Sequence, residues 1–253
     1  MLYKELEMLQ KSLVKALQII DCLCGDKEDF GISEISKELN LNKSNVYDIM
    51  TTFEHFGYVK KDPKSRRYSL SIRFLEIAHK VSAQFTCQAK ARDVINKISD
   101  EIGEVVYFGI PNGDKVMYLE GAFPHQSVSA KPVIGMTAPL TCTGIGKALL
   151  ANYSEEDAAK VLSKPLIAYT DNTITDPVLL KEELRRIKQR GYSIDNMEHE
   201  FGIKCVAVPV FNLSNHLEGA LSITGPSLRF PDEVVLKYAQ ILKNAANVIG
   251  GRV

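Results

Sequence analysis

A cluster of cationic side chains between Asn40 and Tyr68 is the first feature of the sequence that suggests chemistry. The segment holds six Lys and Arg residues against three Asp and Glu residues, which leaves a local excess of three positive charges. Such a cluster suits the phosphate groups of a nucleic acid. Lysines also keep an exposed sheet edge from pairing with other chains, so the cluster alone leaves both interpretations open.

A second group of polar residues, in the C-terminal part, suits a small ligand. The stretch Gly144–Lys147 (GIGK) opens an expected helix, where free N–H groups attract a carboxylate or phosphate, although its spacing is not that of a P-loop. Asp195 is suited to accept hydrogen bonds from ligand hydroxyls. Cys205, Ser222 and Thr224 lie in expected strands, where Ser222 and Thr224 share a face. Close helix packing, a turn cap and ordinary sheet residues are the alternative interpretations.

The sequence gives no support for catalysis or metal binding. It has no evident Ser/His/Asp or Cys/His arrangement, and His125, His199 and His216 lack metal-ligand spacing, so we interpret these histidines as surface residues. The five cysteines are odd in number and form no CxxC motif, which indicates a reducing compartment. We therefore expect no enzyme activity, no cofactor and no metal.

Two expected helices and a hairpin position the cationic segment. Residues 32–40 carry apolar side chains at helical spacing, with Ser33 as a candidate N-cap, and residues 43–56 form a second helical run that Gly57 ends. The pattern of residues 58–70 predicts a strand, a Pro-containing turn and a strand. Two short helices followed by a basic hairpin are typical of a winged helix-turn-helix, which favours DNA binding over the sheet-edge interpretation.

The remaining pattern divides the chain into three parts. A helix over residues 11–24 has a broad apolar face that we expect to pack beneath the helix-turn-helix. A helix over residues 71–85 carries an apolar stripe, and we interpret it as a connector that pairs subunits, because DNA readers of this kind usually bind two half-sites as dimers. The alternative is that it belongs to one of the cores. We expect a DNA-binding domain at 1–71, a connector at 72–88 and a C-terminal domain at 89–253.

The C-terminal part alternates strands with helices, which predicts an α+β fold with an antiparallel sheet and helices on one or both faces. The Asn112-Gly113 turn predicts a hairpin, and Ser154 and Asp176-Pro177 predict helix starts. We expect strands at residues 105–110, 116–119, 126–130, 192–194, 205–211 and 217–224, and helices at residues 91–102, 143–152, 154–162, 176–190 and 231–249.

The composition is that of a globular protein without a membrane segment. The 253 residues contain 31 Lys and Arg and 31 Asp and Glu, so the location of the charges, and not their sum, argues for nucleic acid. The N-terminus lacks an apolar run of signal-peptide length, and no later stretch approaches membrane-spanning length. These features predict a soluble cytoplasmic protein.

Short segments in both parts of the chain form a specific series. The segments are Ser12–Leu17 (SLVKAL), Ile35–Ser36, Lys43–Tyr47 (KSNVY), Gly57–Val59 (GYV), Arg67–Leu70 (RYSL), Pro139–Ala151 (PLTCTGIGKALLA), Gly202–Val210 (GIKCVAVPV) and Leu221–Pro226 (LSITGP). Winged helices are common, but these segments in this order are not. They resemble the segments of the IclR type of bacterial transcriptional regulator, and the resemblance covers nearly the whole chain.

The resemblance implies a ligand-responsive regulator that binds an operator in double-stranded DNA as a homodimer or a dimer of dimers. It also implies a GAF-like C-terminal domain that binds a small organic effector, an organic or sugar acid. The family usually has Arg where this chain has Asp48, which repels phosphates, so we expect the second helix to read bases with its polar residues and the wing to supply more of the affinity.

The candidate DNA contacts are Lys43, Ser44, Asn45, Tyr47, Thr51, Lys60, Lys61, Lys64, Arg66 and Arg67. The effector site implied by the resemblance consists of Gly144, Ile145, Asp195, Ile203, Cys205, Ser222 and Thr224. Two other functions stay open: a GAF-like metabolite-binding enzyme whose winged helix contacts proteins, and a thiol sensor that uses Cys142 and Cys205.

Overall fold

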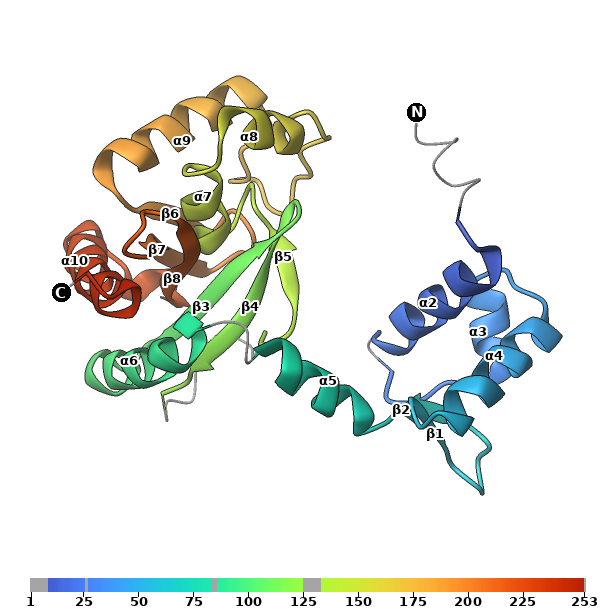
Figure 1. Ribbon diagram of the computed structural model, residues 1–253. Coiled ribbons are helices and arrows are strands. Elements are labelled where there is room, and N and C mark those ends of the chain that lie inside the picture. The colour runs from blue at the N-terminus through green and yellow to red at the C-terminus, as the bar shows by residue number, and fades with distance from the viewer. Residues whose placement is uncertain (1–8, 26, 83–85, 125–132, 253) are drawn as a thin grey trace. The chain divides into compact units, whose positions relative to one another are not determined.

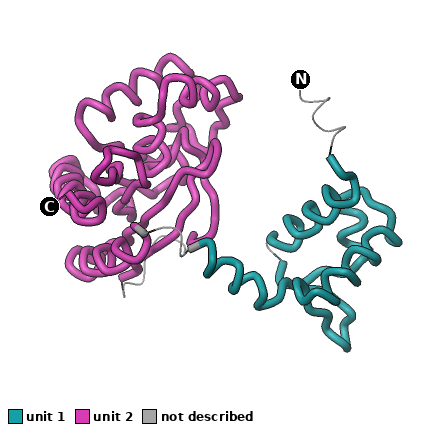
Figure 2. The backbone as a smooth tube through the Cα atoms, viewed as in Figure 1, with its two compact units in different colours: residues 1–84 teal, residues 85–253 magenta. Residues whose placement is uncertain are grey.

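The structure is a computed structural model that describes residues 9–25, 27–82, 86–124 and 133–252 (Figure 1). The backbone forms two compact units, Met1–Gln84 and Phe85–Val253 (Figure 2). Each unit has its own buried apolar core, so the fold of each can be explained by itself.

The N-terminal unit is a winged helix-turn-helix, as the sequence predicts. Its helices bury one face each because their apolar residues recur at helical spacing. The elements are helices α2 (Lys11–Leu23), α3 (Ile32–Glu38) and α4 (Lys43–His55) and the antiparallel wing strands β1 (Val59–Lys61) and β2 (Tyr68–Leu70). The buried core consists of Ile19, Leu23, Phe30, Ile35, Val46, Met50, Val59 and Tyr68.

Helix α3 begins differently from the prediction. Its N-cap residue is Gly31 and not Ser33, which lies inside the helix. The backbone N–H of Gly31 donates to Oε2 of Glu34 at 2.8 Å. A carboxylate in the first turn of the helix therefore binds the backbone N–H of the N-cap residue. This hydrogen bond lowers the pKa of Glu34.

Asp62 closes the turn of the wing. Its Oδ1 accepts hydrogen bonds from the backbone N–H groups of Lys64 and Ser65, at 3.0 and 2.6 Å. Arg66 follows with a φ of 56°, the left-handed conformation that lets the chain return into β2. The turn therefore holds the side chains of Lys64 and Arg66 in solvent at the end of the hairpin.

Helix α5 spans Arg73–Ser82, so it begins two residues after the expected start at residue 71, and residues 83–85 of the expected helix lie outside the described residues. Its apolar side chains and that of the preceding Ile72 are largely exposed: Ile72 is 77 % exposed, Leu75 66 %, Ile77 41 % and Val81 48 %. The apolar stripe seen in the sequence thus lies on the surface of the single chain instead of in either core.

Within residues 86–124 and 133–252, the C-terminal unit forms one antiparallel sheet of six strands in the order β5-β4-β3-β8-β7-β6. Strands β3 and β8, far apart in sequence, are neighbours at its centre. The strands are β3 (Val105–Asn112), β4 (Lys115–Ala122), β5 (Thr137–Pro139), β6 (Ser193–Asn196), β7 (Ile203–Phe211) and β8 (Leu217–Pro226). The sequence did not predict β5, and the strand expected at residues 126–130 lies outside the described residues.

Helices cover both faces of the sheet (Figure 1). One face packs on α6 (Thr86–Ile102) and α10 (Asp232–Gly250), and the other packs on α7 (Gly144–Leu150), α8 (Glu155–Leu162) and α9 (Pro177–Arg190). The predicted α+β class is therefore confirmed. Helix α6 begins at Thr86 instead of the expected Ala91. No helix in the described part of the chain is long and apolar enough to cross a membrane.

Candidate functional site

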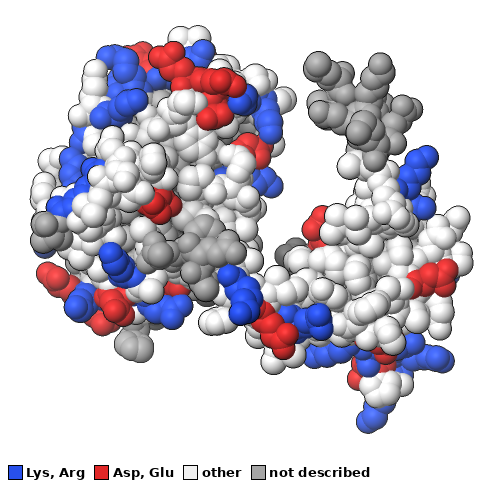
Figure 3. All heavy atoms as spheres, in the orientation of Figure 1, with Lys and Arg blue, Asp and Glu red and all other residues white. Residues whose placement is uncertain are grey.

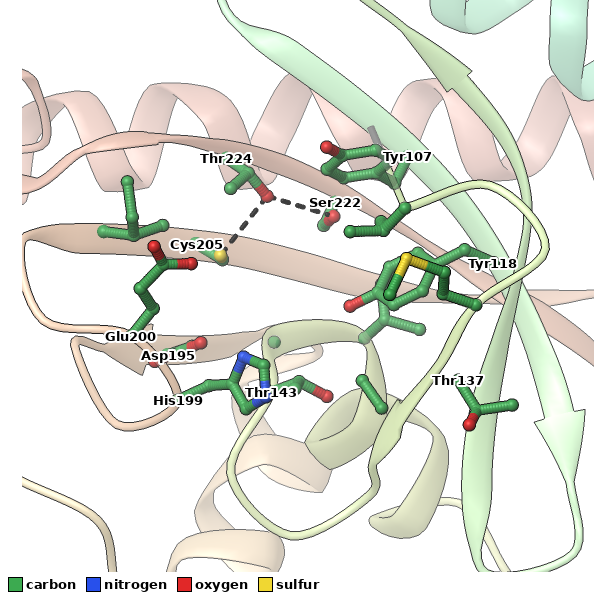
Figure 4. A pocket seen from close by; sticks show the side chains of 16 residues that line it. Tyr107, Tyr118, Thr137, Thr143, Asp195, His199, Glu200, Cys205, Ser222 and Thr224 are labelled. Atoms are coloured by element: carbon green, nitrogen blue, oxygen red, sulfur yellow. Dashed lines mark hydrogen bonds between the residues drawn. The ribbon is translucent and has the colours of Figure 1, made fainter. Parts of the chain in front are cut away.

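A cavity of about 160 Å³, which we call the sheet cavity, lies between α7 and the sheet, beside the segments that follow β4 and β6 (Figure 4). All seven residues that the resemblance assigns to an effector site line it. They come from α7 and from the three successive strands β6, β7 and β8. The seven residues are Gly144, Ile145, Asp195, Ile203, Cys205, Ser222 and Thr224.

Strands β7 and β8 supply a row of polar groups to the sheet cavity. Cys205 pairs with Thr224 in the ladder, and Thr224 Oγ1 donates to Cys205 Sγ at 3.2 Å. Ser222 Oγ lies 3.4 Å from Thr224 Oγ1, so the two hydroxyls share a face, as strand alternation predicts (Figure 4). Because each hydroxyl can donate and accept, the row suits a ligand with oxygen atoms.

The glycines of α7 allow this helix to approach the sheet closely. A Cβ atom on Gly146 would lie 2.5 Å from the backbone oxygen of Pro139, and one on Gly144 would lie 3.0 Å from Cβ of Cys205. Thr143 caps the helix, with Oγ1 accepting from the N–H of Gly146 at 3.0 Å. The packing interpretation therefore holds for Gly146, whereas Gly144 also brings its backbone to the sheet cavity.

Asp195 is the most deeply buried carboxylate of the sheet cavity, with 3 % of the residue exposed. Its Oδ1 accepts a hydrogen bond from the backbone N–H of Glu198 at 2.7 Å. Burial raises the pKa of Asp195 to about 7, because the charged form loses its hydration. Both protonation states of this carboxyl group are therefore accessible near neutral pH.

A buried ion pair lies beside Asp195. The Nζ of Lys147 donates to Oε1 of Glu198, and the two side chains are 1 % and 7 % exposed. Within the described part of the chain, Oε2 of Glu198 has no hydrogen-bond partner. Burial raises the pKa of Glu198, while the Lys147 ammonium acts in the opposite direction. Lys147 is thus bound to an internal carboxylate and does not point to solvent.

The candidate DNA contacts of α4 lie on its outer face. Lys43, Ser44, Tyr47 and Thr51 are exposed, and Asn45 is half-buried. The opposite face of the helix carries Val46 and Met50, which are buried in the core. The second helix of the motif therefore presents one polar face to solvent, the arrangement that a helix entering a DNA groove needs.

The wing carries the remaining cations (Figure 3). Lys60, Lys64 and Arg66 are exposed, whereas the ammonium of Lys61 lies 5.1 Å from the ring centre of Tyr68. Arg67 differs from its neighbours, because its guanidinium is bound to other residues of the same unit.

Three contacts engage Arg67. Its Nε donates to Asp29 Oδ1 at 2.6 Å, and its Nη2 donates to the backbone oxygen of Asp29 at 3.0 Å and lies 2.7 Å from Glu34 Oε2. Two carboxylates thus pair with this candidate phosphate contact, whose side chain is 33 % exposed.

Family comparisons cover both units. Residues 12–63 match the IclR helix-turn-helix domain, and residues 79–250 match the family "Bacterial transcriptional regulator IclR C-terminal". The chain belongs to the IclR family. It is thus a DNA-binding transcriptional regulator.

Relatives of known name span nearly the full length of this IclR chain. The HTH-type transcriptional regulator KdgR of Escherichia coli is 30 % identical over 244 residues, which cover 95 % of this chain and 92 % of KdgR. BhcR of Paracoccus denitrificans is 31 % identical, over 88 % of this chain and 80 % of BhcR.

Solved structures agree with the fold. The Thermotoga maritima IclR structure is 32 % identical and has a TM-score of 0.77, with 96 % of this chain and 98 % of that chain covered. An IclR homologue from Microbacterium hydrocarbonoxydans, complexed with 4-hydroxybenzoate, has a TM-score of 0.84 at 23 % identity, over 95 % of this chain and 98 % of that one.

Several cavity-lining residues of this IclR protein were missed by the sequence analysis. His199, interpreted as a surface residue, is half-buried and lines the sheet cavity, and burial lowers its pKa. Tyr107 and Tyr118 lie with ring centres 5.3 Å apart, and burial raises the pKa of both. Thr137, Thr143 and Glu200 complete the polar lining. Only the strand register could have revealed the tyrosines, because nothing in their local sequence marks them.

Proposed function

We propose that the sheet cavity is the effector site of this IclR regulator and that α4 and the wing contact operator DNA. The observation that carries the proposal is the convergence of seven residues, from α7 and from three successive strands, on one cavity. Packing alone explains close approach at one glycine, but it does not require hydroxyls, a thiol and a carboxylate to surround the same space.

We propose a small organic or sugar acid as the effector. A protein cavity of about 150 Å³ accommodates a molecule the size of benzene, so the sheet cavity of about 160 Å³ suits a ligand of roughly six to ten non-hydrogen atoms. Ser222 supplies a hydroxyl that can donate to its oxygen atoms, whereas the hydroxyl hydrogens of Thr224 and Thr143 are donated to Cys205 Sγ and to the backbone oxygen of Pro139. The Microbacterium homologue, which carries 4-hydroxybenzoate, supports an acid of this size.

At the DNA, α4 enters the major groove with its exposed polar face, and the wing contacts phosphates. Ser44, Tyr47 and Thr51 are the base-reading candidates of this proposal, while Lys60, Lys64 and Arg66 supply charge. Asp48 is exposed on the same helix and weakens phosphate contacts near it. The wing therefore carries more of the affinity than the helix does.

The chain acts as a homodimer or a dimer of dimers in the cytoplasm, where its operator lies. The exposed apolar stripe from Ile72 to Val81 supports the pairing, because an uncovered stripe of this length favours burial against a second copy. We divide the chain into a DNA-binding domain at 1–71, a connector at 72–88 and an effector domain at 89–253. The effector changes the placement of two DNA-binding domains, which requires that it bind their two arrangements with different affinity.

A binding protein is favoured over the two alternatives. Burial raises the pKa of Cys142 to about 12 and that of Cys205 well above its ordinary value, so both are unreactive thiols, and the structure shows both as free. This disfavours a thiol sensor. No reaction of a bound metabolite is suggested by the groups that line the sheet cavity, and turnover of a metabolite without a DNA shift would favour the enzyme.

The deciding experiment combines ligand identification with DNA binding. Mass spectrometry of small molecules released from the purified protein names the effector, and fluorescence anisotropy with DNA from upstream of its own gene reports operator affinity. We expect the released acid to change that affinity. Asp195→Ala should weaken this response and leave DNA affinity without ligand intact. An unchanged response in a folded Asp195→Ala protein would refute the assignment of the site.

A further inference from the structure

The described lining of the sheet cavity contains carboxylates but no Lys or Arg. Asp195 is buried, whereas Glu200 is exposed. Burial lowers the pKa of His199, which keeps its imidazole neutral at neutral pH. The thiol of Cys205 and the phenols of Tyr107 and Tyr118 are also uncharged, because burial raises the pKa of each. A carboxylate ligand would therefore meet no positive side chain among these groups.

The titratable groups around Asp195 also leave a carboxylate ligand without a free positive charge. Glu198 follows it in the chain, and Lys147 faces it from α7. Cys142, which precedes α7, and Cys205 on β7 also face it, as does Tyr118 on β4. These last three groups are neutral.

The charges of this cluster can be summed. Lys147 is already bound to Glu198, so an ionised Asp195 gives the cluster two negative charges against one positive charge. A bound carboxylate would add a third negative charge beside these buried groups. Like charges that share a buried site disfavour joint ionisation.

We propose that an acid effector binds in the sheet cavity together with one proton, which is held on Asp195. This inference rests on the effector role proposed above for the sheet cavity. The ionised ligand enters, solvent supplies the proton, and the carboxyl O–H of Asp195 becomes a hydrogen-bond donor to the ligand. No covalent bond forms or breaks beyond that O–H bond. Dianionic ligands such as phosphate esters are excluded, because one proton leaves a further charge uncompensated.

The sign of the pH dependence follows from the protonation state of the free protein. Below pH 6 Asp195 is largely protonated already, so binding takes up little proton and affinity is constant. Above pH 7 the free protein must gain a proton to bind. Affinity should then fall by about tenfold for each pH unit, with proton uptake approaching one per site.

The test is calorimetric titration of the full-length protein with pyruvate and with 4-hydroxybenzoate at pH 6 and pH 8. Each titration is repeated in two buffers of different ionisation enthalpy, phosphate and imidazole at pH 6 and phosphate and Tris at pH 8, and the difference in observed heat reveals proton uptake. The corresponding amides, pyruvamide and 4-hydroxybenzamide, serve as neutral probes. We expect an acid to bind about tenfold more weakly at pH 8 than at pH 6, with close to one proton taken up at pH 8.

Two variants identify the titrating group. Asp195→Asn keeps a neutral hydrogen-bond donor, so its acid affinity should be independent of pH and its proton uptake should vanish. His199→Gln removes the neighbouring imidazole, and the pH dependence should persist in it whatever the change in affinity. Loss of the pH dependence in His199→Gln, with retention in Asp195→Asn, would overturn the assignment to Asp195.

The remaining outcomes separate this inference from the proposed function. Acid binding without proton uptake at pH 8 would overturn the proton linkage and leave the effector site standing. Tighter binding of an amide than of its acid at pH 6 would overturn the choice of an acid. If no probe binds at millimolar concentration, the acid assignment falls with the proton linkage, while the molecule released from the purified protein still tests the effector site independently.

Discussion

The two units of the protein use charge in opposite ways. In the wing, Lys60, Lys64 and Arg66 stand in solvent, whereas beside the sheet cavity Lys147, Glu198 and Asp195 are almost fully buried. Exposed charges are screened by salt and act additively on a polyanion such as DNA. The stability of a buried charge depends on its oppositely charged partner, and buried charges shift the pKa of neighbouring groups. In the function proposed here, charged residues therefore attract DNA in one unit and select the ligand in the other.

The largest effect should come from breaking the buried ion pair. Glu198→Ala leaves the ammonium of Lys147 buried without its partner, which typically costs about 3–5 kcal/mol of stability. We expect urea denaturation, followed by a signal from the C-terminal unit, to show a loss of this size.

A surface pair of ordinary length supplies the matched control. Lys164 and Asp114 lie 2.7 Å apart, but their side chains are 60 % and 43 % exposed. Lys164→Ala should cost at most about 1 kcal/mol. Equal losses in the two variants would remove the contrast between buried and exposed charge.

The second prediction concerns the exposed charges of the wing. Replacing Lys60, Lys64 and Arg66 together by Ala removes three candidate phosphate contacts. The slope of log K against log salt concentration should become shallower by about 0.9 for each contact, or nearly 3 in total. Anisotropy titrations of operator DNA over a salt series measure the slope. If the slope stays that of the wild type, the wing does not contact phosphates.

The same contrast explains what the sequence could predict. Alternation placed Ser222 and Thr224 on one face, and helical spacing with its caps located α4 and α9, because these signals are local. The ion pair of Lys147 with Glu198 joins residues 51 positions apart, and only the folded chain brings them together. The carboxylate partners of Arg67, Asp29 and Glu34, could not be predicted for the same reason.

The register of the sheet decided the rest of the cavity lining. Tyr107 lies opposite Ser222 only because β3 pairs with β8, which are neighbours in the sheet but not in the chain. The segment around His199 has neither helical nor strand periodicity, so the sequence alone could not predict that it lines the sheet cavity. Local elements were therefore predictable, while the contacts made between them were not.

A third prediction tests the hydroxyl row. Ser222→Ala removes one donor that we assign to the effector, and the loss of one hydrogen bond of this kind costs about 1–2 kcal/mol, or roughly 5- to 30-fold in effector affinity. DNA affinity without effector should not change. Ser163→Ala removes an exposed hydroxyl that bonds only within the end of α8, and it should leave the effector response intact. A full response from a folded Ser222→Ala protein would place the ligand elsewhere.

The smallest and most selective effect is expected from adjacent arginines of the wing. Arg66 points to solvent, whereas Arg67 ties β2 to Asp29 and to Glu34 at the start of α3. Arg67→Ala should lower the melting temperature of the N-terminal unit and leave the salt slope of DNA binding nearly unchanged. Arg66→Ala should do the reverse, with a slope shallower by about 0.9 and an unchanged melting temperature. Since both variants remove one positive charge from neighbouring positions, a shared phenotype would mean that local charge, and not its partner, determines the role of a wing cation.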